Sequence, residues 1–240
     1  MNKTAQLIGT WAGPITIILF ALSFWPFAGF LPPLSPTMTA AEVSAYYQQH
    51  TAGIRFGMVL MMFAGTLNCV FVAAISTQLR RIEKESPMWT YAQLTVGCAG
   101  SVTIIVGAML MTAVAFRPDR GVELTYLLFD IAWLWLVMPG TPAAIQNIVI
   151  GMAILTDKNA KPVFPRWLGF FNIWTGLLFL PGALVTFFKT GPFAWDGLLA
   201  FWLPAGLFVP WFFIMFFMMR KAIRQQDHHG SQPVVATQAA

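Results

Sequence analysis

Long apolar runs alternate with short polar segments along the whole chain. A bilayer core about 30 Å thick needs roughly 20 apolar residues to be crossed by one helix. Six runs reach that length, at residues 7–30, 54–79, 88–116, 123–156, 167–188 and 194–219. The fourth run is long enough for one kinked helix but too short for two spanning helices and a turn. The pattern therefore predicts an all-α, polytopic bundle of six transmembrane helices, within a domain that covers residues 1–220.

The fourth run departs from a plain apolar helix at three places. These are the acid Asp130, the helix-breaking stretch from Pro139 and Gly140 to Pro142, and the amide pair Gln146 and Asn147. Proline removes a backbone donor and clashes with the carbonyl one turn earlier, and glycine loosens the same turn. Irregular backbone at membrane depth is tolerated where it faces protein or a wet cavity. Interrupted helices of this kind mark binding sites in transporters, although a structural kink with an interhelical clamp explains the same residues.

Asp130 shares one face of the fourth run with two aromatic side chains, Tyr126 and Trp133. An ionised aspartate at this depth costs on the order of 3 kcal/mol, so it needs a partner, water or a proton. Arg55, at the outer start of the second run, is the expected ionic partner, and Tyr126 can donate a hydrogen bond. Two interpretations stay open. Either Asp130 contacts a ligand or couples transport, or Asp130 and Arg55 form a structural clamp.

The segment before the second run, residues 31–53, is the largest soluble loop. Its first part, PPLSP, is incompatible with a helix. Thr39 and Glu42 then match a capping box, in which the threonine hydroxyl accepts from the N3 amide and the glutamate reaches back to the cap. A short interfacial helix is therefore expected from Ala40 to about His50, ahead of the spanning helix.

Gly9 and Gly13 form a G-x-x-x-G motif near the start of the first run. Small residues at this spacing let two helix backbones approach closely. Packing within the bundle is the preferred interpretation. The alternatives are a homodimer or a contact with a partner in a membrane complex.

Composition agrees with a membrane protein, and the basic residues give it an orientation. The chain is 58% hydrophobic and only 10% charged, whereas soluble domains are about 25% charged. Basic residues concentrate on cytoplasmic loops, and placing both termini inside puts ten of the 14 Lys and Arg residues there. These ten are Lys3, Arg80, Arg81, Lys84, Lys158, Lys161, Arg166, Arg220, Lys221 and Arg224. The net charge of +5 thus follows from topology without a nucleic-acid partner, and residues 221–240 are expected to form a disordered cytoplasmic tail.

Histidine usage argues against most membrane redox and metal chemistry. Only His50, His228 and His229 occur, and none lies within a predicted span. Haem, copper and di-iron sites depend mainly on histidine ligands, so no metal and no cofactor are expected. Nucleotide motifs such as G-x-x-x-x-G-K-[ST] are missing, and no nucleophile–base pair can be assembled. No catalytic residue is therefore assigned, and the chain is not expected to be an enzyme.

Three stretches, TAGIRFGMVLMMF, KPVFPRWLGFFNIW and FFKTGPFAWDGLLAFWLP, resemble segments of an uncharacterised family of bacterial six-span inner-membrane proteins. The resemblance extends over residues 7–219. It implies a six-span fold in a bacterial inner membrane, and it implies no reaction and no site residue.

The residues favour a small carrier or permease component for a lipophilic or weakly polar organic molecule. In this hypothesis Asp130 couples or gates, Arg55 pairs with it, and the break at residues 139–142 shapes a cavity. The alternative is a non-catalytic accessory or assembly subunit of a membrane protein complex, binding through Gly9 and Gly13. Membrane lipid surrounds the protein in both cases.

Overall fold

Six helical segments that are long and apolar enough to cross a membrane make up the fold. The computed structural model describes residues 3–83 and 86–226. This described part is all-helical, with 80% helix and no strands. The six segments are Lys3–Phe27, Ala40–Leu79, Met88–Phe116, Val122–Leu155, Arg166–Phe187 and Leu198–Arg224. The predicted all-α class is confirmed, and so is the number of helices that are long and apolar enough to span a membrane. The side of the membrane that holds the termini stays a prediction.

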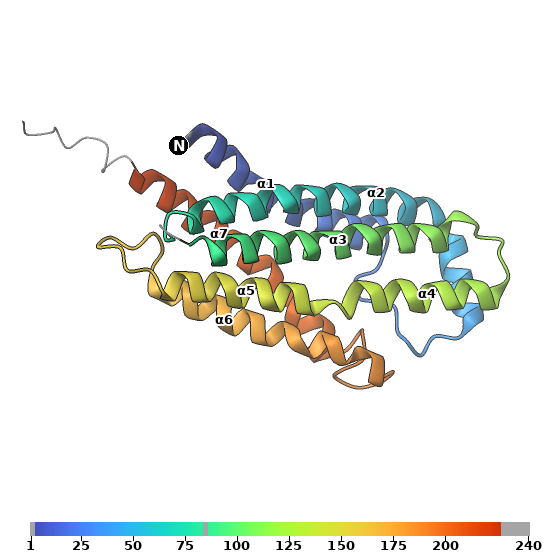
Figure 1. Ribbon diagram of the computed structural model, residues 1–240. Coiled ribbons are helices and arrows are strands. Elements are labelled where there is room, and N and C mark those ends of the chain that lie inside the picture. Colours follow the sequence, from blue (N-terminus) through green and yellow to red (C-terminus); the bar gives the residue numbers. More distant parts are fainter. Residues whose placement is uncertain (1–2, 84–85, 227–240) are drawn as a thin grey trace, which may run out of the picture.

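Several of the six segments are built from more than one helical element. In chain order the elements are α1 (Lys3–Leu22), the π-helix η1 (Ser23–Phe27), α2 (Ala40–Leu79), α3 (Met88–Phe116), α4 (Val122–Val137), α5 (Gly140–Leu155), α6 (Arg166–Phe179), the 3-10 helix η2 (Leu180–Phe187), the π-helix η3 (Leu198–Trp202) and α7 (Leu203–Arg224). Figure 1 shows α2, α3 and the α4–α5 segment running alongside one another, with α6 beside α5 and α7 crossing behind. The start of α1 and the end of α7 lie at the same end of the bundle.

The helix α2 begins at Ala40 because the predicted capping box is present. The backbone N–H of Thr39 donates to Glu42 Oε2 at 2.7 Å, and the N–H of Glu42 donates to Thr39 Oγ1 at 3.3 Å. The predicted short interfacial helix is not separate, however, since α2 continues for 40 residues to Leu79. It carries no proline, and at Gly53 the missing Cβ leaves room for the carbonyl oxygen of Phe27. A helix of this length spans about 60 Å, so α2 projects beyond the bilayer core.

The G-x-x-x-G motif of α1 packs against α2 of the same chain. A Cβ added at Gly13 would collide with the ring of Phe71, and one added at Gly9 would lie 3.3 Å from the Cβ of Ala74. The preferred interpretation of the motif, close packing within the bundle, therefore describes its place in the structure. A homodimer or complex partner at Gly9 and Gly13 stays a prediction, and it would need this face to be released from α2.

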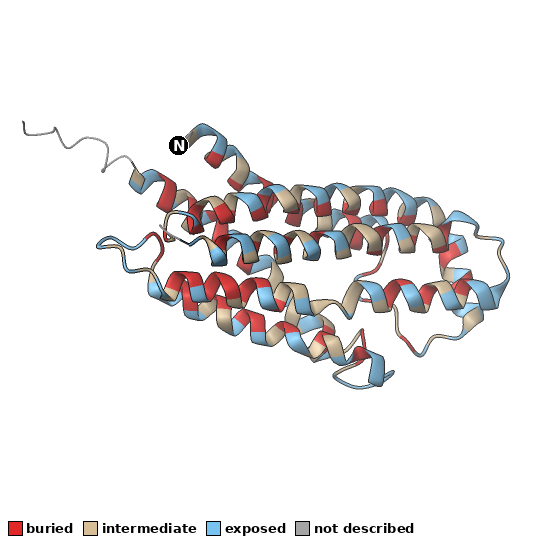
Figure 2. Cartoon of the chain, viewed as in Figure 1, coloured by how far each residue is buried: buried red, intermediate tan, exposed pale blue. Residues whose placement is uncertain are grey.

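Two buried clusters fill the bundle, one toward each end. The first contains Phe30, Tyr47 and Trp133, and the second contains Phe71 and Phe164. Figure 2 shows that buried positions concentrate on the inward faces of the helices and exposed positions along the outer faces. The outer faces are strongly apolar, as large exposed side chains on α1, α6, η2 and other elements show. Such a surface is unfavourable in water and is matched by the acyl chains of a bilayer.

The last helix extends further than predicted. The helix α7 continues to Arg224, so residues 221–224 belong to the bundle and the predicted domain boundary at residue 220 lies too early. The rest of the predicted tail from residue 227, including His228 and His229, lies outside the described residues.

Candidate functional site

A cavity of about 310 Å³ lies in the middle of the bundle, between the two buried clusters. Its wall takes residues from α1, η1, α2, α3, the junction of α4 and α5, the end of α6, η3 and α7. The wall is mainly apolar. Its larger apolar side chains include Phe20, Phe24, Leu136, Phe201, Phe208 and Phe212. Among the described residues that line the cavity, none carries a charged side chain.

A short polar chain enters the cavity wall from α2 and α3. Asn68 of α2 lines the cavity, and its Nδ2 donates to Ser101 Oγ of α3 at 2.9 Å. The Ser101 hydroxyl in turn donates to the carbonyl of Gly97 at 3.1 Å. Asn68 is therefore held in place by a hydrogen bond between two spanning helices.

The amides Gln146 and Asn147 of α5 also line the cavity, and each has a buried atom without a partner. Gln146 is 7% exposed and Asn147 is 3% exposed. Within the described residues, neither Gln146 Nε2 nor Asn147 Oδ1 makes a hydrogen bond. Asn147 Nδ2 donates to the carbonyl of Ala143 one turn earlier, at 2.9 Å, which orients this amide. An unpaired buried polar atom costs about 1–3 kcal/mol. Gln146 Nε2 packs toward α3, 2.7 Å from the position of a Cβ added at Gly97. Both amides thus line the cavity while their unpaired atoms are buried in the wall.

The fourth span is interrupted directly beside these amides. The helix α4 ends at Val137 and α5 begins at Gly140, so Met138 and Pro139 join them. Pro142 explains the break, because its ring would clash with the carbonyl of Met138, four residues earlier, in a continuous helix. In the restarted helix Pro142 falls in the first turn, where backbone N–H groups have no helical partner. Pro139 and Gly140 line the cavity.

Asp130 and Arg55 are not paired in the described part of the chain. Arg55 Nε donates to the carbonyl of Ala115 at 3.1 Å, and its Nη2 donates to the carbonyl of Phe116 at 2.8 Å. These carbonyls end α3, where they lack helical partners and where the helix dipole attracts a cation. The half-buried Asp130 interacts electrostatically with Lys189, which follows η2. The acceptors that hold Arg55 are backbone atoms, which a search for acidic side chains does not find.

Trp133 lies in the aromatic core of the bundle and is not itself part of the cavity lining, although it contacts the lining residue Phe24. Its buried Nε1 makes no hydrogen bond within the described residues. Its ring packs edge-on against Phe24 and Phe30, with centroid distances of 6.0 and 5.5 Å, and it stacks on Trp195 at 6.2 Å. Tyr126 packs against the same core. The face predicted to carry Tyr126, Asp130 and Trp133 is therefore largely a packing face.

The cavity thus divides the predicted site residues into two groups. Its lining contains Pro139, Gly140, Gln146 and Asn147. Arg55, Tyr126, Asp130, Trp133 and Pro142 lie outside the lining. The amide pair and the start of the helix break come together as one site, whereas Asp130 and its neighbours do not reach it.

Much of the cavity wall comes from the sixth span, in which the sequence singled out no site residue. Phe201 of η3 lines the cavity together with Pro204, Ala205 and Phe208 of α7. The chain changes from a π-helix to an α-helix just before Pro204, and π-turns inside helices are frequent at functional sites. Pro204 within an apolar run was the available signal for this irregularity.

Among the described residues, no group of three or more His, Cys, Asp or Glu side chains is placed to hold a metal ion. The strongest functional feature of the structure is instead the uncharged cavity with its two unpaired amide atoms. Comparison with protein-family models, curated proteins and solved structures finds no match.

Proposed function

We propose that the chain is a multi-pass protein of a bacterial inner membrane that binds an uncharged, lipophilic or weakly polar organic molecule in the central cavity. It acts as a small carrier or permease component for that molecule. The observation that carries this proposal is the cavity of about 310 Å³, whose apolar wall contains two buried and unpaired amide atoms.

The size and chemistry of the cavity set the class of ligand. Pockets for small molecules have volumes of about 300–1,000 Å³ and combine an apolar wall with a few polar groups that fix orientation. Gln146 Nε2 is an unpaired donor and Asn147 Oδ1 an unpaired acceptor. A turn of these side chains toward the cavity would let a ligand with a hydroxyl, carbonyl or amide group pair with them. A charged ligand is disfavoured, because the described lining supplies no opposite charge and a buried unpaired charge is costly.

The rim of the cavity supports access from the bilayer. Trp25 of η1 and Val209 of α7 line the cavity, and they are 66% and 43% exposed. The cavity therefore reaches the outer surface of the bundle at an apolar place, where a lipophilic molecule dissolved in lipid can enter. The break between α4 and α5 at the opposite wall resembles the interrupted helices at transporter sites.

Asp130 is not assigned to ligand binding in this proposal. It lies outside the described cavity lining, so direct contact with the bound molecule is not part of the proposed mechanism. The predicted role of Asp130 in coupling or gating stays a prediction, whereas its predicted partner Arg55 binds carbonyls at the end of α3 instead.

Native mass spectrometry of the full chain, purified from its membrane in mild detergent, tests the proposed function. The expected result is a retained uncharged organic molecule that is lost when the detergent is made harsher. A chain without any small molecule, but with a stoichiometric protein partner, would contradict the carrier and favour an accessory subunit of a membrane complex.

A further inference from the structure

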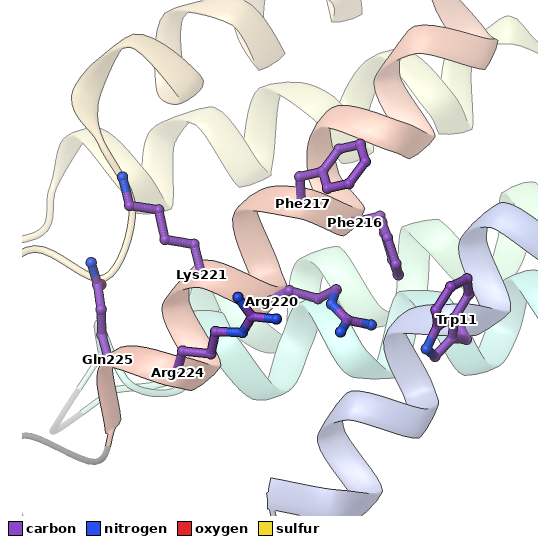
Figure 3. Close-up of a pocket in the computed structure, with 7 residues that line it drawn as sticks. All are labelled: Trp11, Phe216, Phe217, Arg220, Lys221, Arg224 and Gln225. Carbon is purple, nitrogen blue, oxygen red and sulfur yellow. The ribbon is translucent and has the colours of Figure 1, made fainter.

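A groove of about 570 Å³ lies between the start of α1 and the end of α7, and it shares no lining residue with the central cavity. Its wall combines three aromatic and three cationic side chains. The aromatic ones are Trp11, Phe216 and Phe217, and the cationic ones are Arg220, Lys221 and Arg224. Figure 3 shows Trp11 on α1 across from Phe216 on α7, with the Arg220 side chain extending toward Trp11.

The two walls of the groove are held together by side-chain contacts. The ring centroids of Trp11 and Phe216 lie 4.9 Å apart. The guanidinium carbon of Arg220 lies 5.4 Å from the Trp11 centroid and 5.2 Å from the Phe216 centroid. A guanidinium that stacks on aromatic faces keeps the N–H groups at its edge available for bidentate bonds to a phosphate. Arg220 is therefore positioned by the rings without using its donors.

The positive charge of the groove is not neutralised by the described residues. The side chains of Arg220, Lys221 and Arg224 make no hydrogen bond or ion pair with any other described residue. Arg220 and Arg224 are four residues apart and thus lie on one face of α7, where like charges repel. A bound anion would remove this repulsion.

The neighbouring Arg81 differs from the groove cations, because its side chain is bound to acceptors within the protein. Arg81 Nη1 donates to Gln78 Oε1 at 2.7 Å and to the carbonyl of Ala222 at 3.0 Å. Burial lowers the pKa of Arg81, and the negative charge of Asp157 acts in the opposite direction. The donors of Arg81 are committed to the protein, whereas those of Arg220 and Arg224 are not.

Exposed apolar side chains continue from the cations along both helices. Trp11 and Ile15 of α1 are 50% and 42% exposed, and Phe217 and Phe213 of α7 are 59% and 36% exposed. Tryptophan is typical of the level at which headgroups meet acyl chains. Basic pockets between spanning helices bind anionic lipid headgroups. The groove thus presents cations at its end and an apolar path leading away from them.

We propose that this groove binds one anionic phospholipid, with Arg220 and Arg224 on its phosphate and one acyl chain against Trp11 and Phe217. Charge complementarity favours this occupant over a second copy of the chain, since a symmetric dimer would bring identical cations together. It also favours a lipid over a soluble anion, which would leave the aromatic wall without a partner.

The test measures lipid binding to the full chain in detergent by native mass spectrometry, using phosphatidylglycerol and phosphatidylcholine with identical acyl chains. Wild type should bind phosphatidylglycerol more tightly. The change Arg220→Gln with Arg224→Gln should weaken phosphatidylglycerol binding roughly 30-fold, because each basic residue near an anionic headgroup contributes a factor of about five. Phosphatidylcholine binding should change little. The control Lys158→Gln with Lys161→Gln removes two exposed charges from a loop at the same end of the bundle and should leave both affinities unchanged.

A second variant guards against loss of folding. Lys221→Gln with Arg224→Gln leaves the stacked Arg220 in place and should also weaken phosphatidylglycerol binding selectively. Equal losses in the loop control would overturn the proposal, as would a wild type that does not distinguish the two lipids. Binding of glycerol 3-phosphate as tight as that of phosphatidylglycerol would identify a soluble-phosphate site and equally reject the lipid. A dimer that forms without lipid and is disrupted by Arg220→Gln would show that a second copy occupies the groove.

Discussion

At the scale of single residues, the contrast between paired and unpaired amides is the strongest sign of function. Buried polar groups are paired in the great majority of cases. Asn172 follows this rule, since its Nδ2 donates to the carbonyl of Leu168 at 2.8 Å and its Oδ1 accepts from Trp211 Nε1 at 2.9 Å. Gln146 and Asn147 do not follow it within the described residues. Gln6 Nε2 and Gln93 Nε2, outside the cavity lining, also lack a partner among the described residues. The position at the cavity wall, together with the unpaired atom, therefore distinguishes Gln146 and Asn147.

This contrast predicts opposite effects of two similar substitutions on the empty protein. Gln146→Leu removes an unpaired donor, so the thermal unfolding midpoint in detergent should stay the same or rise. Asn172→Leu leaves the buried Trp211 Nε1 without an acceptor, which should cost about 1–3 kcal/mol and lower the midpoint. Thermal unfolding of both variants, stripped of ligand, provides the measurement. A loss in Gln146→Leu as large as in Asn172→Leu would mean that Gln146 is a structural residue.

Arg55 and Asp130 permit a second test at this scale. Because Arg55 binds carbonyls at the end of α3, Arg55→Ala should destabilise the protein whether or not Asp130 is present. The effects of Arg55→Ala and Asp130→Asn on the unfolding free energy should therefore add within about 0.5 kcal/mol. Recovery of stability in the double variant would instead support the interpretation of Arg55 and Asp130 as a structural clamp.

At the scale of helices, the break between α4 and α5 depends on a close approach at Gly140. A Cβ added there would lie 2.5 Å from the carbonyl oxygen of Phe179, at the end of α6. The break therefore lets the neighbouring span pack directly against the backbone at the cavity wall. Gly206 of α7 differs, because a Cβ there meets nothing within 4 Å.

The two glycines form a matched pair for mutation. Gly140→Ala should lower the unfolding midpoint, because the backbone of α6 or α5 must shift to make room. Gly206→Ala should raise it, since alanine is favoured over glycine in a helix interior by about 1 kcal/mol. Thermal unfolding in the same detergent compares them. Similar effects of the two changes would show that no close packing exists at the break.

Sequence patterns predicted the helical elements more accurately than they predicted the contacts between those elements. The six spans follow from the length of the apolar runs, and the start of α2 follows from Thr39 and Glu42, because these signals are local. The break at Pro139 and the amide pair were likewise visible as departures from a plain apolar helix. The partner of Arg55 could not be predicted, because backbone carbonyls at the end of α3 leave no mark in the sequence. The close approach of the Phe27 carbonyl to Gly53 joins residues that are distant in the chain, so no local pattern predicts it.

At the scale of the whole molecule, the structure groups the connecting segments by bundle end, and the basic residues predict which end faces the cytoplasm. Gln48 Nε2 donates to the carbonyl of Pro118 at 3.1 Å, so the start of α2 and the loop after α3 lie at one end. Reporter fusions near Gln48 and Arg120 should therefore be exported, and fusions after Lys158 and Arg224 should be cytoplasmic, as the basic residues predict. Reporter activity on each side provides the measurement. An exported reporter at Lys158 would mean that the chain turns back at Pro139 and that the six-span topology is wrong.

Two buried clusters with an uncharged cavity between them define the architecture of the whole molecule. Packing is dense toward both ends, and the irregular turns at η1, η3 and the α4–α5 break all contribute to the cavity wall. Irregular backbone at η1, η3 and the α4–α5 break thus lies at the cavity wall, whereas none of the described lining comes from η2.

Filling the cavity tests the central claim most directly. Ala143 lines the cavity and Ala99 is exposed on the outer face of α3, so Ala143→Phe blocks the site while Ala99→Phe adds the same ring elsewhere. Small-molecule retention is measured by native mass spectrometry on both variants and wild type, with thermal unfolding as the check on folding. Wild type and Ala99→Phe should retain an uncharged organic molecule, and folded Ala143→Phe should not. Equal retention by folded Ala143→Phe, or no retention by wild type, would contradict a ligand site in the cavity.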